Sequence, residues 1–386
     1  MNYSNLIEHE FRTLYGEQPL MVRSPGRVNL IGEHTDYNLG FVLPGAIDKA
    51  AYFAVAPRND MKCSFYALDL RDKHETDLEH LEYTKKGWPN YLMGVIQQLL
   101  KGGGRLGGIN CVFGGDIPIG AGVSSSAALE AGLAFALNRI FDLGLDGLSL
   151  ARLAQKAENE FVGVRCGIMD QYANIFGLKG HVLRIDCRSL EHTYYPFDSD
   201  SVSIVLFDTG VSHSLASSEY NRRRAECTEG VAILRSRHPE ISSLRDATPS
   251  TVDECRELLP DNIYRRCKYV VEEDERVLRA CRLLQEGDLR GMGALMGKSH
   301  EGLRDLYEVS CKELDFLEQS VSTDSSVYGS RMMGGGFGGC TINIVENSSV
   351  AGLCAEAAER YKSQFAIDLK SYVMTIGSGT GLVGAQ

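Results

Sequence analysis

A glycine-rich segment of the 386-residue chain, at residues 114–126, combines residue types that could bind a phosphate group. It runs GGDIPIGAGVSSS and contains two spaced glycines followed by three serines: Gly120, Gly122, Ser124, Ser125 and Ser126. Glycines let backbone N–H groups approach an anion, and a helix N-terminus with serine hydroxyls favours negative charge. An ordinary serine-capped helix after a turn has the same spacing. We therefore expect either a phosphate-binding loop or a capped helix start.

A second polar cluster lies in RSPGRVNLIGEHTDYNLG, residues 23–40. Its polar side chains stand among glycines and short apolar residues: Arg27, Glu33, His34, Asp36 and Asn38. Such a set could hydrogen-bond the hydroxyl groups of a polyol, because a wrong ligand would leave buried polar groups unpaired. A polar turn between two strands would have the same composition, so both interpretations stay open on composition alone.

Two further glycine patterns are excluded as nucleotide sites on physical grounds. The run Gly297-Lys298-Ser299 resembles the end of a P-loop, but Met292 stands where the first glycine is required. The run GGGFGG at 334–339 satisfies a dinucleotide-binding spacing, yet a strand-like segment, CTINIV, follows where a helix is needed. The physical alternative for this second run is a bulged hairpin.

Composition limits the class of protein. The chain has 40 Lys and Arg against 51 Asp and Glu, a net charge of −11, which argues against binding to nucleic acids or anionic membranes. Its eleven cysteines never form a C-x-x-C pair, so neither a zinc site nor a disulfide framework is indicated. The sequence has neither a signal-peptide pattern nor an apolar run of about 18 residues. These features predict a soluble, cytoplasmic protein.

The order of predicted elements shows what must position the two polar clusters. We expect a helix over 5–16, strands near 20–31, 51–57 and 62–68, a helix from Pro89 to the glycines at 102–104, and a strand at 109–113. After the glycine-rich loop we expect two amphipathic helices, strands at 181–187 and 202–208, a polar helical block over 218–310, and a helix then a strand within 350–376. A change of pattern near 180–200 predicts two domains, 1–200 and 201–386.

Five segments, taken in chain order, carry a resemblance to a known family. They are PGRVNLIGEHTDYN at 25–38, PIGAGVSSSAALE at 118–130, CGIMDQ at 166–171, SEYNRRR at 218–224 and GGGFGGC at 334–340. Together they resemble the galactokinases, a branch of the GHMP small-molecule kinase family. The resemblance implies an α+β fold of two GHMP kinase domains, with the active site in the cleft between them. The N-terminal domain would contain a mixed sheet with helices, and the C-terminal domain an antiparallel sheet with helices.

The resemblance also implies roles for individual residues. Those expected to hold the sugar are Glu33, His34, Thr35, Asp36, Gly167 and Tyr220. Those expected to hold ATP are Gly120, Ala121, Gly122, Val123, Ser124, Ser125 and Ser126 at the phosphates, and Trp88 at the adenine. The metal ligands for Mg²⁺ would be Ser126 and Glu158. Asp170 would be the catalytic carboxylate, and Arg27 would stabilise the transition state.

Three of these assignments compete with plainer interpretations. On an ideal helix, Glu158 and Glu160 lie on opposite margins of the apolar stripe, so geometry alone does not choose a ligand and either could be a solvated flank. Trp88 could equally be a core aromatic at a helix entry. An aspartate such as Asp170, in a loop, is by itself typical of a cap or turn.

Two other polar features receive no site role. His300 lies in a helical pattern, where packing or a structural hydrogen bond is the usual role of a histidine. The arginine run 222–224 is too short for a nucleic-acid patch and is typical of ion pairs or a solvated face.

The reaction that the resemblance implies transfers the γ-phosphoryl group of MgATP to the anomeric O1 of galactose, the first committed step of the Leloir pathway. We expect Asp170 to orient O1 and to accept its proton late, because the neighbouring Arg27 favours the charged carboxylate. The alternatives are a catalytically silent regulator that responds to galactose and ATP, and a kinase of a related sugar such as N-acetylgalactosamine or arabinose. The pair Ser126-Ala127 is present, which favours an enzyme. We expect a monomer rather than an obligate oligomer.

Overall fold

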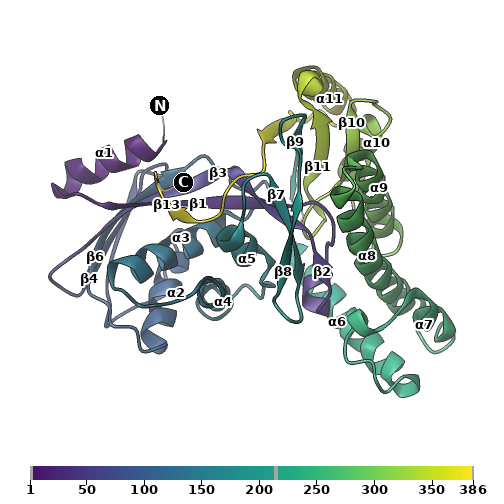
Figure 1. Ribbon diagram of the computed structural model, residues 1–386, viewed down its shortest axis with the longest axis horizontal. Helices are drawn as coiled ribbons and strands as arrows, with labels where there is room; N and C mark the ends of the chain where they lie inside the picture. The colour runs from purple at the N-terminus through teal and green to yellow at the C-terminus, as the bar shows by residue number, and fades with distance from the viewer. Residues whose placement is uncertain (1–2, 213–215, 385–386) are drawn as a thin grey trace.

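The computed structural model describes residues 3–212 and 216–384, and these form two lobes that lie side by side (Figure 1). The N-terminal lobe is built on a six-stranded sheet, and the C-terminal lobe combines a four-stranded sheet with long helices. A three-stranded sheet lies at the centre of the view, between them. Over the described residues, no helix is long and apolar enough to cross a membrane.

The six-stranded sheet has the order β13-β1-β3-β6-β4-β5. Its strands are β1 (Leu20–Asn29), β3 (Pro44–Pro57), β4 (Lys62–Ala67), β5 (Asp72–Asp77), β6 (Ile109–Gly115) and β13 (Gly381–Leu382). It is a mixed sheet, because β4 runs parallel to β6 and the other pairs are antiparallel. Since successive residues of a strand face opposite sides, Phe53 packs on α2 (Trp88–Lys101) and α3 (Ser125–Ile140), whereas Ala54 packs on α1 (Tyr3–Tyr15).

Gly132 brings α3 close to the sheet. A Cβ at this position would lie 2.4 Å from Cε2 of Phe53 and 2.8 Å from Cβ of Ser24, so only glycine allows this approach. The chain continues through α4 (Gly147–Ala157), a π-helical turn (Glu158–Val162) and α5 (Met169–Phe176). Tight packing of α3 on the sheet holds its N-terminus beside β1, which carries Arg27 of the second polar cluster.

The four-stranded sheet has the antiparallel order β10-β11-β9-β12. Its strands are β9 (Val202–Ser212), β10 (Val327–Met332), β11 (Gly338–Glu346) and β12 (Lys370–Met374). Successive residues of β9 again face opposite sides of the sheet. Leu206 packs on α8 (Asp261–Gln285) and α9 (Leu289–Asp305), whereas Phe207 packs on α10 (Lys312–Val321) and α11 (Val350–Phe365). The helices α6 (Ala216–Arg237) and α7 (Pro249–Glu254) extend from the lower end of this lobe (Figure 1).

The central sheet pairs β2 (Phe41–Val42) with β7 (His181–Asp186), and β7 with β8 (His192–Pro196). Because β2 follows β1 directly and β7 follows α5, this sheet joins the polar segment 23–40 to the helix that carries Asp170. Arg27 and Asp170, which are 143 positions apart in the sequence, therefore meet in one region.

The fold class expected from the sequence, α+β with a mixed sheet and a separate antiparallel sheet, is confirmed. The rejected P-loop pattern lies inside α9, and the run 334–339 lies between the paired strands β10 and β11. The expected strands omit β2, β5, β8 and β13: β5, for example, reads DKHETD, a charged and partly exposed edge strand without an apolar alternation. The division into domains at residue 200 stays a prediction.

Candidate active site

The glycine-rich loop between β6 and α3 is anchored by alternate residues. Ala121 and Val123 are buried in the core, whereas Gly120 and Gly122 are exposed. Both glycines have positive φ angles, +83° and +72°, which residues with side chains rarely adopt. The exposed face of the loop is therefore bare backbone at the N-terminus of a 16-residue helix, where anions are favoured.

Ser124 precedes α3 in the left-handed conformation, with φ 57°, and makes no capping hydrogen bond. Its hydroxyl donates instead to Oδ2 of Asp170. The first N–H groups of α3 consequently lack the usual serine cap. The capped helix start, which the sequence left open, does not form, and the loop keeps donors available for an anion.

Arg27 and Asp170 form a bidentate ion pair beside this loop. Nε of Arg27 lies 2.8 Å from Oδ1 of Asp170, and Nη2 lies 2.6 Å from Oδ2. Nη1 donates to the carbonyl oxygen of Gly122 at 2.5 Å. Burial alone would lower the pKa of the Arg27 guanidinium. The charge of Asp170 and its hydrogen bonds have the larger combined effect and raise this pKa. One arginine thus joins the carboxylate on α5 to the glycine-rich loop.

Glu158 is buried, not placed at the margin of a regular helix as ideal geometry suggested. A π-helical turn begins at this residue, and Cys166 and Gln171, which follow that turn in the chain, donate hydrogen bonds to Oε2 of Glu158. Burial and the charge of Asp170 raise the pKa of Glu158, and a hydrogen bond from Ser126 opposes that rise. Glu160 is exposed and accepts hydrogen bonds from Gln98 and Lys101, which leaves Glu158 as the carboxylate beside the loop.

A second buried carboxylate next to Glu158 was not expected. The Nε2 atom of Gln171 donates to Oε2 of Glu158 at 2.7 Å and to Oε2 of Glu130 at 3.2 Å. Burial raises the pKa of Glu130 well above its ordinary value. Glu130 lies within a quoted sequence motif, but an acidic residue in a helix ordinarily faces solvent, so its position in the sequence gave no sign of burial.

The carboxylate of Glu33 is oriented by a residue from the other lobe. Arg331, fully buried in β10, donates from Nη2 to Oε1 of Glu33 at 2.9 Å, and the N–H of Gly334 donates to the same oxygen at 3.0 Å. Arg331 also donates to the carbonyl oxygens of Asn29, Leu30 and Met332. Both of these bonds go to Oε1 of Glu33, and Oε2 can accept a hydrogen bond from a ligand. The sequence patterns do not reveal Arg331, because its partners are about 300 residues away.

His34 is a neutral ring within an aromatic cluster. Burial, followed by the charge of Arg223, lowers the pKa of His34 to about 3. Its Nδ1 lies 2.8 Å from the hydroxyl oxygen of Tyr37, and its Nε2 has no partner. The ring of Tyr220, from α6, stands 5.6 Å from the ring of His34. Tyr220 and His34 therefore meet as the sequence predicted, and one buried imidazole nitrogen stays available.

Thr35 and Asn38 bond within the loop that carries His34. The hydroxyl of Thr35 lies 2.9 Å from the carbonyl oxygen of Gly32 and 2.5 Å from that of Phe41. The amide of Asn38 donates to the carbonyl oxygen of His34 at 2.8 Å. These bonds hold His34 at its positive φ of 63°. Thr35 thus shapes the loop through its hydroxyl, a contribution distinct from a ligand contact.

Asp36 and Gly167 approach so closely that only glycine fits. A Cβ at position 167 would lie 1.8 Å from Oδ2 of Asp36. Burial raises the pKa of Asp36 to about 6; a hydrogen bond from the N–H of Tyr37 opposes this, and the charges of Asp170 and Glu33 add to it. Glu33 and Asp36, from the segment 23–40, and Asp170, from α5, thus place three carboxylates in one region.

Trp88 begins α2 and lies half-buried at the edge of the core of the N-terminal lobe. Its Nε1 donates to Oδ2 of Asp72 at 3.0 Å, and its ring centroid lies 5.3 Å from that of Phe113. Both interpretations drawn from the sequence, a helix-entry aromatic and an adenine contact, are compatible with this partial exposure. The adenine contact stays a prediction.

Gly336 provides a test of the glycine run between β10 and β11. Its φ is +86°, and a Cβ would lie 2.2 Å from the carbonyl oxygen of Val309. We expect Gly336→Val to lower the free energy of unfolding by about 2–6 kcal/mol, combining backbone strain and overpacking. Gly335→Ala is the matched control, because its nearest neighbour, Cδ2 of Tyr220, would lie 3.5 Å away. Equal urea midpoints for the two variants would contradict this account.

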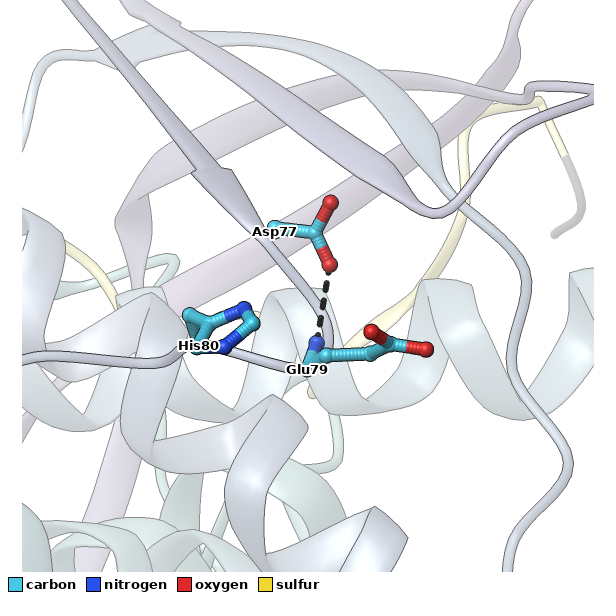
Figure 2. Close-up of side chains that lie close together, drawn as sticks. All are labelled: Asp77, Glu79 and His80. Atoms are coloured by element: carbon cyan, nitrogen blue, oxygen red, sulfur yellow. Dashed lines mark hydrogen bonds between the residues drawn. The ribbon is translucent and has the colours of Figure 1, made fainter.

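A separate group of possible metal ligands, Asp77, Glu79 and His80, lies at the end of β5 (Figure 2). Glu79 and His80 are exposed, and one Asp77 oxygen accepts the N–H of Glu79 at 2.9 Å, as in an ordinary turn. The strand β5 is four strands away from β1, or about 19 Å at the usual strand spacing. This group is therefore separate from the site around Arg27 and Asp170.

Comparison with known proteins identifies the family. A model of the galactokinase galactose-binding signature matches residues 9–57, and models of the GHMP kinase N-terminal and C-terminal domains match residues 90–178 and 280–363. A galactokinase of Roseiflexus sp. is 42% identical over 98% of this chain and 96% of its own length. The chain belongs to the galactokinase family. Another member, from Chloroflexus aggregans, is 44% identical over 97% of both chains.

A solved structure supports this assignment to the galactokinase family in three dimensions. The galactokinase of Lactococcus lactis, determined in complex with galactose, superposes with a TM-score of 0.93. It is 33% identical to this chain, and the superposition covers 98% of this chain and 99% of the other. The two-lobed arrangement described above is therefore the fold of the galactokinase family.

Proposed function

We propose that this protein transfers the γ-phosphoryl group of ATP to the anomeric O1 of galactose, giving galactose 1-phosphate and ADP. The observation that carries the proposal is the Arg27–Asp170 pair, which joins the glycine-rich loop to a region with two further carboxylates. A phosphate donor on one side and a polyhydroxyl acceptor on the other would meet at this pair. Membership of the galactokinase family supports the same substrates.

The glycine-rich loop would hold the phosphates of ATP. Its exposed backbone at residues 120–122 and the uncapped N-terminus of α3 supply N–H donors, with hydroxyls from Ser125 and Ser126. Phosphoryl transfer passes through a loose transition state, so positioning and charge stabilisation provide most of the catalysis. Arg27, anchored to both the loop and Asp170, would stabilise charge on the transferred group.

Asp170 would orient the O1 hydroxyl of the sugar and accept its proton. Both of its oxygens already accept hydrogen bonds, from Arg27 and from Ser124, so the carboxylate is fixed in direction before a substrate arrives. Holding an acceptor in the attack geometry reduces the entropy that the reaction must lose. The proton would move to Asp170 late, as the O1–phosphorus bond forms.

Ser126 and Glu158 fit a Mg²⁺ ion by their chemistry. Both offer hard oxygen ligands, and the burial that raises the pKa of Glu158 would be offset by a cation beside it. When bound, Mg²⁺ would neutralise charge on the ATP phosphates. Gln171 holds Oε2 of Glu158, which leaves its other oxygen for the ion.

The sugar would be selected by Glu33, His34 and Asp36. Nε2 of His34 lacks a partner in the described part of the chain, and Arg331 and Gly334 bond only Oε1 of Glu33. Sugar hydroxyls can pair with this nitrogen and donate to Oε2 of Glu33. Gly167 allows Asp36 to come close, and Tyr220 lines the same region. A sugar that leaves one of these buried groups unpaired would be rejected.

The raised pKa of Asp36 predicts how sugar binding depends on pH. Burial raises this pKa to about 6, so the carboxylate is charged above that pH and protonated below it. We expect galactose affinity, measured by calorimetry without nucleotide, to fall by up to about tenfold per pH unit below pH 6. Nucleotide is left out because phosphate groups titrate in the same range. An unchanged pH profile in Asp36→Asn would contradict the assignment.

A coupled assay of ADP release with several acceptors tests the proposed function. The panel is galactose, N-acetylgalactosamine, arabinose, glucose and mevalonate, each at equal concentration with MgATP. We expect the highest kcat/KM with galactose. Highest activity on another sugar would favour a related sugar kinase, and binding of galactose and ATP without turnover would favour a regulator.

We further propose that the protein acts in the cytoplasm as a monomer. Gel filtration would test the oligomeric state.

A further inference from the structure

The C-terminal end of the chain returns from the second lobe to the first. Residues 376–383, here called the C-terminal strap, leave β12 and end at β13, which pairs with β1 (Figure 1, yellow). The strap is bonded closely to the first lobe: the N–H of Gly377 donates to Ala46 at 2.8 Å, and that of Gly379 donates to Gly177 at 2.7 Å. A Cβ at Gly379 would lie 2.6 Å from the carbonyl oxygen of Ile175, so the strap lies directly against the end of α5.

One strap side chain completes a buried hydrogen-bonded cluster. The hydroxyl of Thr380 donates to Oδ1 of Asn174 at 2.5 Å, and it lies 3.0 Å from the hydroxyl oxygen of Ser24. The N–H of Thr380 donates to the carbonyl oxygen of Asn174 at 2.8 Å. Asn174 and Ser24 are both fully buried, so these bonds are not exchanged with water.

Asn174 uses its amide nitrogen to hold a distortion in β1. The pairing of β1 with β3 is irregular between Pro25 and Arg27, and Nδ2 of Asn174 donates to the carbonyl oxygen of Pro25. A bulge leaves a backbone group outside the ladder and redirects the side chain that follows. Arg27 is the residue at which regular pairing resumes after this irregularity, and its side chain bonds Asp170.

Strand β1, which carries Arg27, and helix α5, which carries Asp170, are thus connected by two sets of hydrogen bonds. Arg27 bonds Asp170, and two residues before Arg27 the backbone of Pro25 is bonded to Asn174, one turn after Asp170 on α5. We propose that Thr380 and Asn174 are positioning residues, through which the C-terminal strap fixes the direction of Arg27 toward Asp170. The inference rests on the proposed function, since it assigns a catalytic consequence to the hydrogen bond between Asn174 and Pro25.

Thr380→Val tests the role of the strap. Valine keeps the shape of threonine and removes the hydroxyl that holds Oδ1 of Asn174. We expect kcat to fall by about 10- to 100-fold, because small displacements of a reacting group have effects of this size. The KM values for galactose and ATP should stay within about twofold, because the hydroxyl of Thr380 bonds Ser24 and Asn174 and none of the residues proposed to hold galactose or ATP. Thr380→Ser, which keeps the hydroxyl, should restore most of the wild-type kcat.

Ser378→Ala is the matched control on the same strap. Ser378 is exposed, and its backbone carbonyl, which is unaffected by the change, accepts the bond from Arg23 at 2.8 Å. We expect kcat of this variant to equal that of the wild type. All variants are assayed below their melting temperatures, and circular dichroism checks that each is folded. If Thr380→Val does not fold, Thr380→Cys, with a weak donor of similar size, carries the same test.

The outcomes separate this inference from the proposed function. A wild-type protein that releases no ADP with galactose would overturn the proposed function. An active wild type with unchanged kcat in Thr380→Val would overturn the inference alone, and so would a lower melting temperature with unchanged kcat. A loss of kcat that serine does not restore would also count against it, because the hydroxyl is the group proposed to act.

Discussion

Replacement of Asp170 by asparagine is expected to lower kcat by about 10²- to 10⁴-fold, the usual contribution of a positioned general base. Asparagine keeps the size of the side chain and one oxygen acceptor for Arg27, but it cannot take the O1 proton. Galactose and ATP should bind with affinities within about threefold of the wild type, because neither the sugar segment nor the glycine-rich loop is altered. Calorimetry and steady-state kinetics on the same preparation separate the two effects.

Asp142→Asn is the control for Asp170→Asn. Asp142 is exposed at the end of α3 and undergoes the same chemical change outside the site. Its kcat should match that of the wild type. Turnover within about threefold of the wild type in Asp170→Asn would remove Asp170 from the mechanism. If Asp170→Asn instead binds neither galactose nor ATP, Asp170 acts mainly as the structural partner of Arg27.

Arg331→Met is expected to abolish galactose binding and to destabilise the protein strongly. The change removes the cation that faces Glu33 and the donors to two carbonyl oxygens of the same loop. Removal of one partner of a buried ion pair costs about 3–5 kcal/mol, because the remaining charge is left uncompensated. We expect the melting temperature to fall by about 4–6 °C and the KM for galactose to rise at least tenfold. Differential scanning calorimetry and kinetics measure these changes.

A double variant distinguishes stability from orientation. In Arg331→Met/Glu33→Gln the uncompensated charge is removed. We therefore expect the melting temperature to rise part of the way back to that of the wild type, whereas galactose binding is not restored. Arg360→Met is the exposed control: Arg360 pairs with Glu356 on one helix face, and such pairs contribute less than about 1 kcal/mol. Galactose binding that survives in Arg331→Met would contradict the assignment of Glu33.

The local features of the site were predictable from the sequence, because they depend on neighbouring residues. Positive φ angles at Gly120 and Gly122 follow from glycine type and loop position, and burial of Ala121 and Val123 follows from their alternation with those glycines. Most of the longer strands and helices likewise follow from their apolar periodicity, whereas the charged strand β5 does not. Residue roles came from the resemblance to galactokinases, since spacing alone left phosphate binding and a simple cap equally open.

The parts that sequence could not predict depend on contacts between distant segments. Arg331 is an arginine within a strand, and nothing near it indicates that it bonds the loop at Glu33. Thr380 and Asn174 are ordinary small polar residues until the strap crosses between lobes. Glu158 belongs with these residues: Cys166 and Gln171, from later segments, bond its carboxylate, which a helical period cannot anticipate.

Product analysis by phosphorus NMR tests the central claim most directly. Galactose is incubated with MgATP and the protein, and the new phosphate signal is assigned by its coupling to a sugar proton. The account predicts one mole of ADP per mole of sugar phosphate, with the phosphorus coupled to the anomeric proton H1. ADP release without a sugar phosphate, or phosphate coupled to a proton at another carbon, would contradict transfer to O1.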